Sequence, residues 1–328
     1  MGNQGYRIKV GITMGDPSGI GPGIIAKSIG RLKSQAEFII IGDKWVFDKN
    51  LKFKIPACPA GRQKPKFKFI DLNNVPHKNF SFGKVKRDYG RASMEYLEKA
   101  LELIKAREID CLVTCPISKE AVNLAGFNWP GHTEYLARYS QSNDFIMMLL
   151  NKQLKITLVT RHIPLKSVWL QLNKDKIYKA ISLTYKSLKE IFLIKNPRIV
   201  VCGLNPHASD NGLIGKEENG IIKPVLRNLR RKIRYLDGPL SADVAISKAN
   251  RKEYDCVVAM YHDQALIPLK MDGDSPGVNI TLGLDFIRTS PLHGTAFDIA
   301  KDHTLANPLS LIEAIKLAIR CTSNLRKD

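Results

Sequence analysis

The sequence lacks the marks of several protein classes. No run of about 18 apolar residues occurs, so we expect no transmembrane helix and no membrane partner. The segment at 6–10 leads directly into an apolar, strand-like run, without a signal-peptide pattern. The six cysteines lack Cys-x-x-Cys spacing and mostly lie inside apolar runs, which is typical of reduced core residues. We therefore expect a cytoplasmic protein.

Acidic residues are also scarce, with 31 Asp and Glu against 51 Lys and Arg, and the net charge is +20. Such an excess can indicate a protein that binds nucleic acid or anionic lipid. However, the basic residues are scattered, dense only in short patches such as 227–234, and no nucleic-acid motif accompanies them. We expect no nucleic-acid partner and attribute the charge to coding bias, with some attraction for acidic substrates.

Short apolar runs alternate with segments of helical period along the chain, which predicts a parallel α/β architecture. The chain of 328 residues is long enough for two such domains. Strands are expected at residues 9–13, 37–41, 110–115, 145–150, 155–160, 198–203, 256–261 and 278–282. Helices are expected at residues 91–107, 174–195, 217–232 and 308–320. We expect residues 1–131 and 277–328 to form one discontinuous domain around an inserted domain at 132–276.

Three histidines each follow a predicted buried strand: His162, His207 and His262. In parallel sheets the carboxyl ends of the strands converge on the ligand crevice. Three imidazoles there would suit Zn²⁺ or a similar first-row ion with positions open for substrate, although any one of them alone would more often be structural. Asp263 follows His262 directly and Asp243 lies at a predicted helix start, so either carboxylate could accept a proton during oxidation of an alcohol.

Two further regions could bind anions. The glycine-rich segment 15–23 joins a strand to a helix, but it is neither a Walker motif nor G-x-G-x-x-G, and a tight structural turn explains it equally well. A phosphate could be bound by Lys270, Asn279 and Arg288, because the planar guanidinium of Arg can form two hydrogen bonds and the Lys ammonium adds a compact charge. Any one of these residues alone would more simply be a surface residue. The loop at 131–134 leads into a predicted helix, where backbone N–H groups can bind an anion.

Seven segments of the sequence, spread over nearly the whole chain, match one known family in order. They are residues 15–22 (GDPSGIGP), 131–134 (GHTE), 202–208 (CGLNPHA), 260–264 (MYHDQ), 277–283 (GVNITLG), 286–290 (FIRTS) and 293–300 (HGTAFDIA). On these motifs the chain resembles the 4-hydroxythreonine-4-phosphate dehydrogenases of vitamin B6 synthesis.

The resemblance implies a fold of two α/β/α domains around a cleft, like that of the isocitrate and isopropylmalate dehydrogenases. It implies oxidation of 4-phosphooxy-L-threonine by NAD or NADP to 2-amino-3-oxo-4-phosphooxybutanoate. That product loses CO₂ to give 3-amino-2-oxopropyl phosphate. The discontinuous domain would lie on the nucleotide side, and the inserted domain on the metal and dimer side.

The resemblance also implies roles for individual residues. His162, His207 and His262 would bind one divalent metal ion (Zn²⁺, Mg²⁺, Mn²⁺ or Co²⁺) at a homodimer interface, with ligands from both subunits. The family's substrate-binding positions fall on His132, Thr133, Lys270, Asn279 and Arg288. The cofactor-binding positions fall on Gly294, Thr295 and Asp298. Asp243 or Asp263 remains our candidate for the catalytic proton acceptor.

The sequence departs from the family pattern mostly near the cofactor positions. Leu292 stands where Asp is usual, residues 301–303 (KDH) replace Gly-Lys-Gly, Asp285 replaces Pro, and Gly23 takes a place that is more often acidic. The choice between NAD and NADP therefore stays open.

Three alternative functions also stay open. A dehydrogenase for a phosphothreonate or phosphoerythronate would share the metal and phosphate motifs. A metal-dependent hydrolase could use three histidines to activate water. A basic nucleic-acid-binding protein is the third alternative.

Overall fold

The computed structural model describes residues 7–32, 36–51, 67–128, 131–140, 142, 144–271 and 276–326. The chain divides into two compact units: Ser142–Gly283, and the segments Met1–Gln141 and Leu284–Arg326 that flank it. These bounds differ from the expected 132 and 276. The helix at His132–Tyr139 groups with the flanking unit, and the strand at Val278–Leu282 groups with the inserted unit because it pairs with a strand there.

The flanking unit contains a parallel sheet in the order β3-β2-β1-β4-β11. Its strands are β1 (Ile8–Thr13), β2 (Ala36–Gly42), β3 (Phe67–Asp71), β4 (Cys111–Thr114) and β11 (Ile287–Pro291). Every residue of β4 and β11 is buried, as expected for parallel strands that are covered on both faces.

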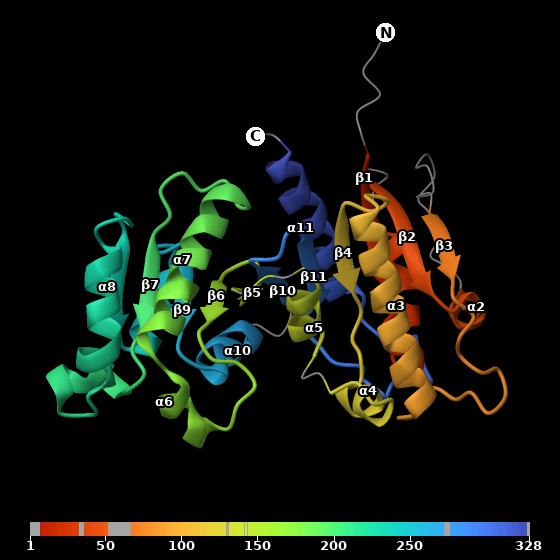
Figure 1. The fold of residues 1–328 in the computed structure, drawn as a ribbon, viewed down its shortest axis with the longest axis horizontal. Coiled ribbons are helices and arrows are strands. Elements are labelled where there is room, and N and C mark those ends of the chain that lie inside the picture. Colours follow the sequence, from red (N-terminus) through yellow and green to blue (C-terminus); the bar gives the residue numbers. More distant parts are fainter. Residues whose placement is uncertain are drawn as a thin grey trace, which may run out of the picture. The chain divides into compact units, whose positions relative to one another are not determined.

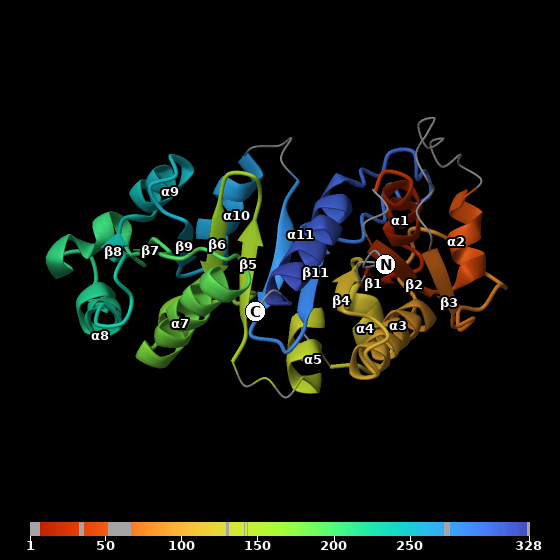
Figure 2. The ribbon, with the colours of Figure 1, turned by 90° about the horizontal axis from the view of Figure 1, so that it is seen from above.

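Helices cover both faces of this sheet. They are α1 (Gly21–Ile29), α2 (Lys44–Leu51), α3 (Arg87–Lys105), α4 (Lys119–Leu124), α5 (His132–Tyr139) and α11 (Leu309–Leu325). Helices α3 and α4 lie on one face and α1 and α11 on the other (Figure 2). The helix expected at 91–107 is found as α3, and its residues Tyr96, Leu97, Ala100 and Leu101 are all buried.

The inserted unit has a mixed sheet in the order β10-β5-β6-β9-β7-β8. Its strands are β5 (Ile146–Leu150), β6 (Lys155–Leu158), β7 (Ile199–Cys202), β8 (Leu236–Leu240), β9 (Cys256–Ala259) and β10 (Val278–Leu282). Strand β5 is antiparallel to both of its neighbours, whereas β6, β9, β7 and β8 are parallel. The arrows of β6 and β7 point in the same direction in Figure 1. The carboxyl ends of β6, β9 and β7 therefore lie at one edge of this sheet.

The helices of the inserted unit also form two layers. They are α6 (Val168–Gln171), α7 (Lys174–Glu190), α8 (Lys223–Leu229), α9 (Ala242–Asn250) and α10 (His262–Met271), with short turns at η1 (Leu165–Ser167), η2 (Pro206–Gly212) and η3 (Glu218–Ile222). Helices α7 and α8 pack together on one face, and α9 and α10 lie on the other (Figure 2). The predicted α/β class is confirmed in both units.

Two expectations from composition concern the cysteines, predicted to be reduced core residues, and the lack of a transmembrane helix. The five cysteines within the described ranges are buried and unbridged, whereas Cys58 lies outside those ranges. Across the described part of the chain, no helix combines the length and apolarity that crossing a membrane requires.

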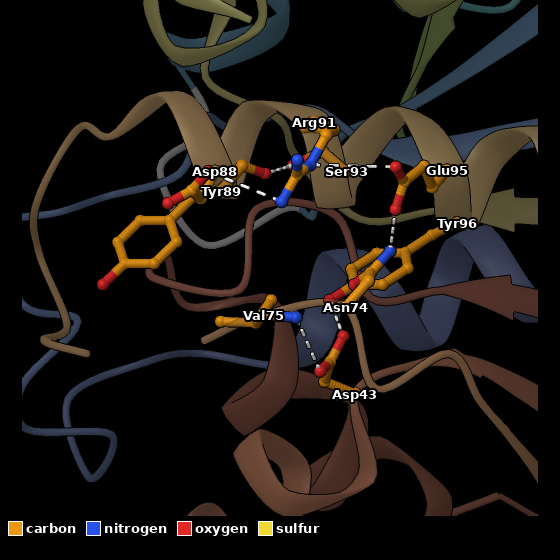
Figure 3. Close-up of polar contacts among 9 residues, drawn as sticks. All are labelled: Asp43, Asn74, Val75, Asp88, Tyr89, Arg91, Ser93, Glu95 and Tyr96. Carbon is orange, nitrogen blue, oxygen red and sulfur yellow. Dashed lines mark hydrogen bonds and ion pairs between the residues drawn. The ribbon is translucent and has the colours of Figure 1, made fainter. Parts of the chain in front are cut away.

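A buried carboxylate joins α3 to the end of β2. Asp43 accepts a hydrogen bond from the backbone N–H of Val75 at 3.0 Å and from the Tyr96 hydroxyl at 2.6 Å (Figure 3). Burial, together with the charge of Asp43, holds the pKa of Tyr96 well above its ordinary value. The hydroxyl therefore remains a proton donor at any working pH, and the contact positions α3 against the sheet.

We expect Tyr96→Phe to lower the free energy of unfolding by about 1–3 kcal/mol, because it leaves one buried oxygen of Asp43 without its donor. Chemical denaturation measures the effect. Tyr254→Phe is the matched control, because it removes a hydroxyl–carboxylate bond to Asp237 at an exposed site and should cost less than about 0.5 kcal/mol. Equal losses in the two variants would show that burial of the pair is unimportant.

A second buried carboxyl lies in the turn between β1 and α1. Asp16 is fully buried and accepts a hydrogen bond from the backbone N–H of Ser18 at 2.9 Å. Burial raises its pKa to about 7, against the opposing effect of backbone N–H groups of Ser18 and Ser118. Asp16 is therefore largely protonated in the folded protein at a pH where the unfolded chain has already ionised it.

Because its folded pKa is raised, Asp16 favours folding below its unfolded pKa and loses that contribution as the pH rises toward about 7. Relative to Asp16→Asn, the wild-type protein should lose up to about 4 kcal/mol of unfolding free energy across this window. Denaturant titrations between pH 4 and pH 8 measure the difference. Parallel curves for the two proteins would contradict the raised pKa, and Asp88→Asn, at an exposed carboxyl on α3, is the control.

Candidate active site

The three predicted metal-binding histidines lie after three adjacent parallel strands. His162 follows β6, His207 follows β7, and His262 begins α10, three positions after the last residue of β9. Strand β9 pairs with β6 on one side and with β7 on the other. Figure 1 shows α6 and α10 at this edge of the inserted unit. The polypeptide thus brings all three histidines to the carboxyl edge of one sheet, as expected from the sequence.

Two of these imidazoles are neighbours. The ring centroids of His162 and His262 are 5.6 Å apart, with an angle of 49° between the rings. The Nδ1 atom of His262 lies 2.7 Å from Oδ1 of Asp263. When Nδ1 carries the proton of this hydrogen bond, the lone pair of Nε2 is available to a metal ion. Asp263 is therefore placed to orient the ring of His262.

Buried hydrogen bonds tie the ends of the three strands together. Thr160 donates to the carbonyl oxygen of Met260 through its backbone N–H at 3.1 Å and its hydroxyl at 2.7 Å, which joins β6 to β9. Gln264 accepts from the backbone N–H of Met260 at 2.8 Å and donates to the carbonyl oxygen of Gly203 at 2.9 Å. Gln264 thereby joins β9 to β7. The sequence showed Gln264 within a family motif but gave no sign of this role.

His207 lies in an unusual backbone segment. The five residues from His207 to Asn211 all have left-handed conformations, with φ between 41° and 71°. None of them is glycine, and a left-handed conformation costs other residues roughly 1–2 kcal/mol each. Strain of this kind concentrates where the surrounding structure holds a functional group in a required direction.

Asp243 lies in the first turn of α9, near His207. The Ser241 hydroxyl and the backbone N–H of Val244 lower the pKa of Asp243, and the charge of His207 contributes in the same direction. Asp243 is therefore an ionised carboxylate at neutral pH. It is competent to accept a proton, although a lowered pKa makes it a weak base by itself.

The histidines suit a divalent metal ion in the chemistry of their donor atoms. All three side chains are at least partly exposed, and neutral imidazole is a ligand for several first-row ions. In the part of one chain that the structure describes, no group of three or more His, Cys, Asp or Glu side chains is close enough to hold a metal ion. A shared three-histidine set therefore stays a prediction.

The flanking unit contains three of the predicted substrate-binding residues. Arg288 lies on β11, is 2% exposed, and donates to the Thr114 hydroxyl at the end of β4 at 2.6 Å. Burial lowers its pKa to about 10, with Glu134 acting in the opposite direction, so the guanidinium is still charged at neutral pH. His132 begins α5, and burial followed by the charge of Arg288 lowers the pKa of His132 well below its ordinary value. Thr133, the next residue, is buried.

The other two predicted substrate-binding residues belong to the inserted unit. Lys270 is exposed near the end of α10. Asn279 lies on β10, where its side-chain oxygen is buried without a hydrogen-bond partner among the described residues. A buried amide oxygen of this kind can accept a hydrogen bond from a bound ligand.

The glycine-rich turn at 15–23 and the predicted cofactor-binding residues differ in how accessible they are to a ligand. In the glycine-rich turn, the backbone N–H groups of Asp16, Ser18, Gly19 and Ile20 all donate to protein oxygens, the last of them to the carbonyl of Thr295 at 3.0 Å. These amides are not available to a phosphate, and the segment acts as a packed turn. Gly294 and Asp298, in contrast, are exposed.

Two departures from the family pattern are packed against each other. A Cβ atom at Gly23 would lie 2.8 Å from Nδ1 of His303, so the absence of a side chain at Gly23 makes room for this ring. The ring of His303 also meets Phe82 edge-on, with 4.7 Å between the centroids. The two unusual residues therefore belong to one packing arrangement.

Comparison with known proteins agrees with the resemblance seen in the motifs. The family model described as pyridoxal phosphate biosynthetic protein PdxA matches residues 34–318. A 4-hydroxythreonine-4-phosphate dehydrogenase of Sulfurihydrogenibium sp. (strain YO3AOP1) is 43% identical over 318 residues, covering 95% of this chain and 98% of that protein. A crystal structure of 4-hydroxythreonine-4-phosphate dehydrogenase from Klebsiella pneumoniae matches with a TM-score of 0.84 and 35% identity, covering 98% of this chain and 99% of that one.

A relative with another name is nearly as similar. A D-threonate 4-phosphate dehydrogenase of Cupriavidus necator is 40% identical over 323 residues, covering 95% of this chain and 96% of that protein. Because the family model matches most of its length and such relatives cover nearly all of it, the chain belongs to the PdxA family of pyridoxal phosphate biosynthetic proteins.

Proposed function

We propose that the chain oxidises 4-phosphooxy-L-threonine at C3 with NAD or NADP, in a reaction that requires one divalent metal ion. The match to 4-hydroxythreonine-4-phosphate dehydrogenases over 95% of the chain carries this proposal. It makes the protein an oxidoreductase of pyridoxine biosynthesis. The position of three histidines at one sheet edge supports the requirement for a metal ion.

The reaction divides into oxidation and decarboxylation. The C3 hydrogen leaves as hydride and the C3 hydroxyl loses a proton, which gives 2-amino-3-oxo-4-phosphooxybutanoate. The β-keto acid then releases CO₂ and takes up a proton at C2 to give 3-amino-2-oxopropyl phosphate. When bound, the metal ion would polarise the C3 oxygen and the nicotinamide ring would accept the hydride.

His162, His207 and His262 are the residues that would hold the metal ion. Each would present a ring nitrogen from the segment that follows its strand, and the hydrogen bonds of Thr160 and Gln264 join the ends of these strands. A fixed ligand set lowers the cost of ordering the site when metal and substrate bind.

Asp243 is the better candidate for the proton acceptor. Asp263 is engaged with Nδ1 of His262, which suits it to orienting that ring. Asp243 lies near His207 and is ionised, so it can receive the proton of the C3 hydroxyl. Its weak basicity is sufficient when the pKa of that hydroxyl is itself lowered.

The charged and amide residues would bind the phosphate and the polar groups of the substrate. Arg288 offers a buried guanidinium, which interacts more strongly with an anion than an exposed one because little water screens it. His132 is neutral and can act as a hydrogen-bond partner without repelling Arg288. Lys270 would add an exposed positive charge and Asn279 a buried amide.

Exposed apolar side chains near the histidines support a homodimer with the active site at its interface. Leu165, in the turn after His162, is 71% exposed, and Leu213, just after the left-handed turn, is 88% exposed. Large apolar side chains that remain exposed beside a proposed site can mark a protein interface. A second copy of this chain is the partner that we propose.

Oxidation of D-threonate 4-phosphate is the second candidate function. The 40% identity to a D-threonate 4-phosphate dehydrogenase favours it specifically. The two substrates share the phosphate and the C3 alcohol and differ at C2, where one carries an amino group and the other a hydroxyl. The metal and phosphate residues would therefore serve either one. The hydrolase and nucleic-acid alternatives have no support from the family match.

We expect NADH or NADPH to form from 4-phosphooxy-L-threonine and to stop when a chelator removes the metal ion. The assay follows absorbance at 340 nm, with D-threonate 4-phosphate and 4-phosphoerythronate in parallel and with each nucleotide. Turnover of D-threonate 4-phosphate alone would favour the second candidate. Release of inorganic phosphate without nucleotide would contradict both.

We expect His207→Ala to lower turnover by at least about 100-fold and to reduce bound metal, because it removes one of three proposed ligands. Metal content by elemental analysis and turnover are measured on the same preparation, and circular dichroism checks folding. His77→Ala is the matched control, because His77 stacks on Trp45 in the flanking unit and has no proposed ligand role. Full metal content with full activity in His207→Ala would contradict the proposed site.

A further inference from the structure

We propose that Glu218 is a positioning residue for the metal site, because its buried carboxylate holds the left-handed turn that carries His207. This inference rests on the proposed role of His207 as a metal ligand. Glu218 opens the η3 turn, which follows the left-handed segment in the chain, and its side chain is fully buried. Nothing in the sequence pattern distinguishes it from the neighbouring Glu217.

The carboxylate of Glu218 binds the chain immediately before the turn. Its Oε1 atom accepts hydrogen bonds from the backbone N–H groups of Leu204 and Asn205, both at 2.8 Å. Its Oε2 atom accepts from the side-chain amide of Asn205 at 2.9 Å. Three donors therefore point at one buried side chain, two residues ahead of His207.

The far end of the turn is held by the next residue along η3. The side-chain amide of Asn219 donates to the carbonyl oxygen of Asn211 at 2.9 Å. Both ends of the left-handed segment are thus joined to two consecutive residues, Glu218 and Asn219. A backbone conformation that L-residues disfavour persists only when its surroundings fix it, and these contacts fix it.

Only a carboxylate satisfies this arrangement completely. Glutamate offers two acceptor oxygens, whereas glutamine of the same shape offers one oxygen and one N–H₂ group. In Glu218→Gln, one of the two positions would place a donor against a donor of Leu204 or Asn205. Glu217 also accepts from the side-chain amide of Asn205, at 2.8 Å, but it contacts neither backbone N–H that Glu218 binds. The turn therefore depends on Glu218 for its backbone anchor.

Loss of this anchor should let the turn relax and move the imidazole of His207 away from the other proposed ligands. Groups that orient a metal ligand typically change metal affinity by about 10–100-fold when they are removed. We expect Co²⁺ to bind Glu218→Ala at least about tenfold more weakly than the wild-type protein, with Glu218→Gln between the two.

The test uses the full chain and Co²⁺ as the probe. Titration calorimetry gives the dissociation constant, and the visible absorption bands of bound Co²⁺ report the geometry of its ligands. Glu190→Gln is the control, because it removes an exposed carboxylate of α7 that forms an ion pair with a surface lysine, Lys186. It should bind Co²⁺ with the wild-type affinity and spectrum.

Hydrogen exchange on the metal-free proteins supplies a second readout. The backbone amides of Leu204 and Asn205 should exchange faster in Glu218→Ala, whereas those of β7 should keep their protection. A merely structural role would lower stability without changing the Co²⁺ spectrum. If Glu218→Ala fails to fold, Glu218→Gln decides the matter.

Two negative results can be told apart. If the wild-type protein binds Co²⁺ and both Glu218 variants bind it with unchanged affinity and spectrum, the positioning role is overturned while the proposed function stands. If the wild-type protein binds no Co²⁺, Zn²⁺ or Mn²⁺, the proposed metal site fails and the positioning role fails with it.

Discussion

The parallel alignment of β6, β9 and β7 is the constraint on which the proposed active site depends. Leu158 pairs with Ala259, and Val201 pairs with Val258, so the loops after these strands start side by side. Two buried polar side chains, Thr160 and Gln264, then join the strand ends beyond the last backbone pairs. The ligand loops are therefore held by the sheet itself, and each histidine needs only a short segment to reach the same edge.

In each unit the proposed functional residues include or depend on polar groups that are costly to bury and that are therefore closely hydrogen-bonded. Arg288 keeps its charge inside the flanking unit beside the Thr114 hydroxyl, and Glu218 keeps a carboxylate inside the inserted unit against three donors. Such buried polar groups add little to the free energy of folding. They hold the neighbouring side chains and backbone in one orientation, because each group would lose its hydrogen bonds if its surroundings moved. We infer that burying these two groups lowers the stability of the fold and preorganises the residues around them.

The sequence predicted the strands that carry the histidines and missed the elements whose residues are atypical. Strands β7 and β9 are continuous apolar runs, and β6 begins the run from Lys155 to Thr160, in which polar residues alternate with Ile and Leu but three of the four strand residues are buried. The sequence did not predict strand β8, because its Gly238 and Pro239 are typical of a turn. Proline is tolerated in this strand because β8 lies at the edge of its sheet, where an N–H group can be spared. The sequence did not predict the left-handed turn, since none of the residues from His207 to Asn211 is glycine. It also gave no sign of the contacts of Glu218, because they join residues 13 and 14 positions apart in the chain.

An anomalous-scattering map of crystals grown with Co²⁺ tests the central claim most directly, because it locates the metal independently of any assay. We predict one strong peak per active site at about 2.0–2.1 Å from a ring nitrogen of each of His162, His207 and His262, with a second copy of the chain supplying part of the set. A peak at other residues, or none at this edge of the inserted unit, would contradict the account.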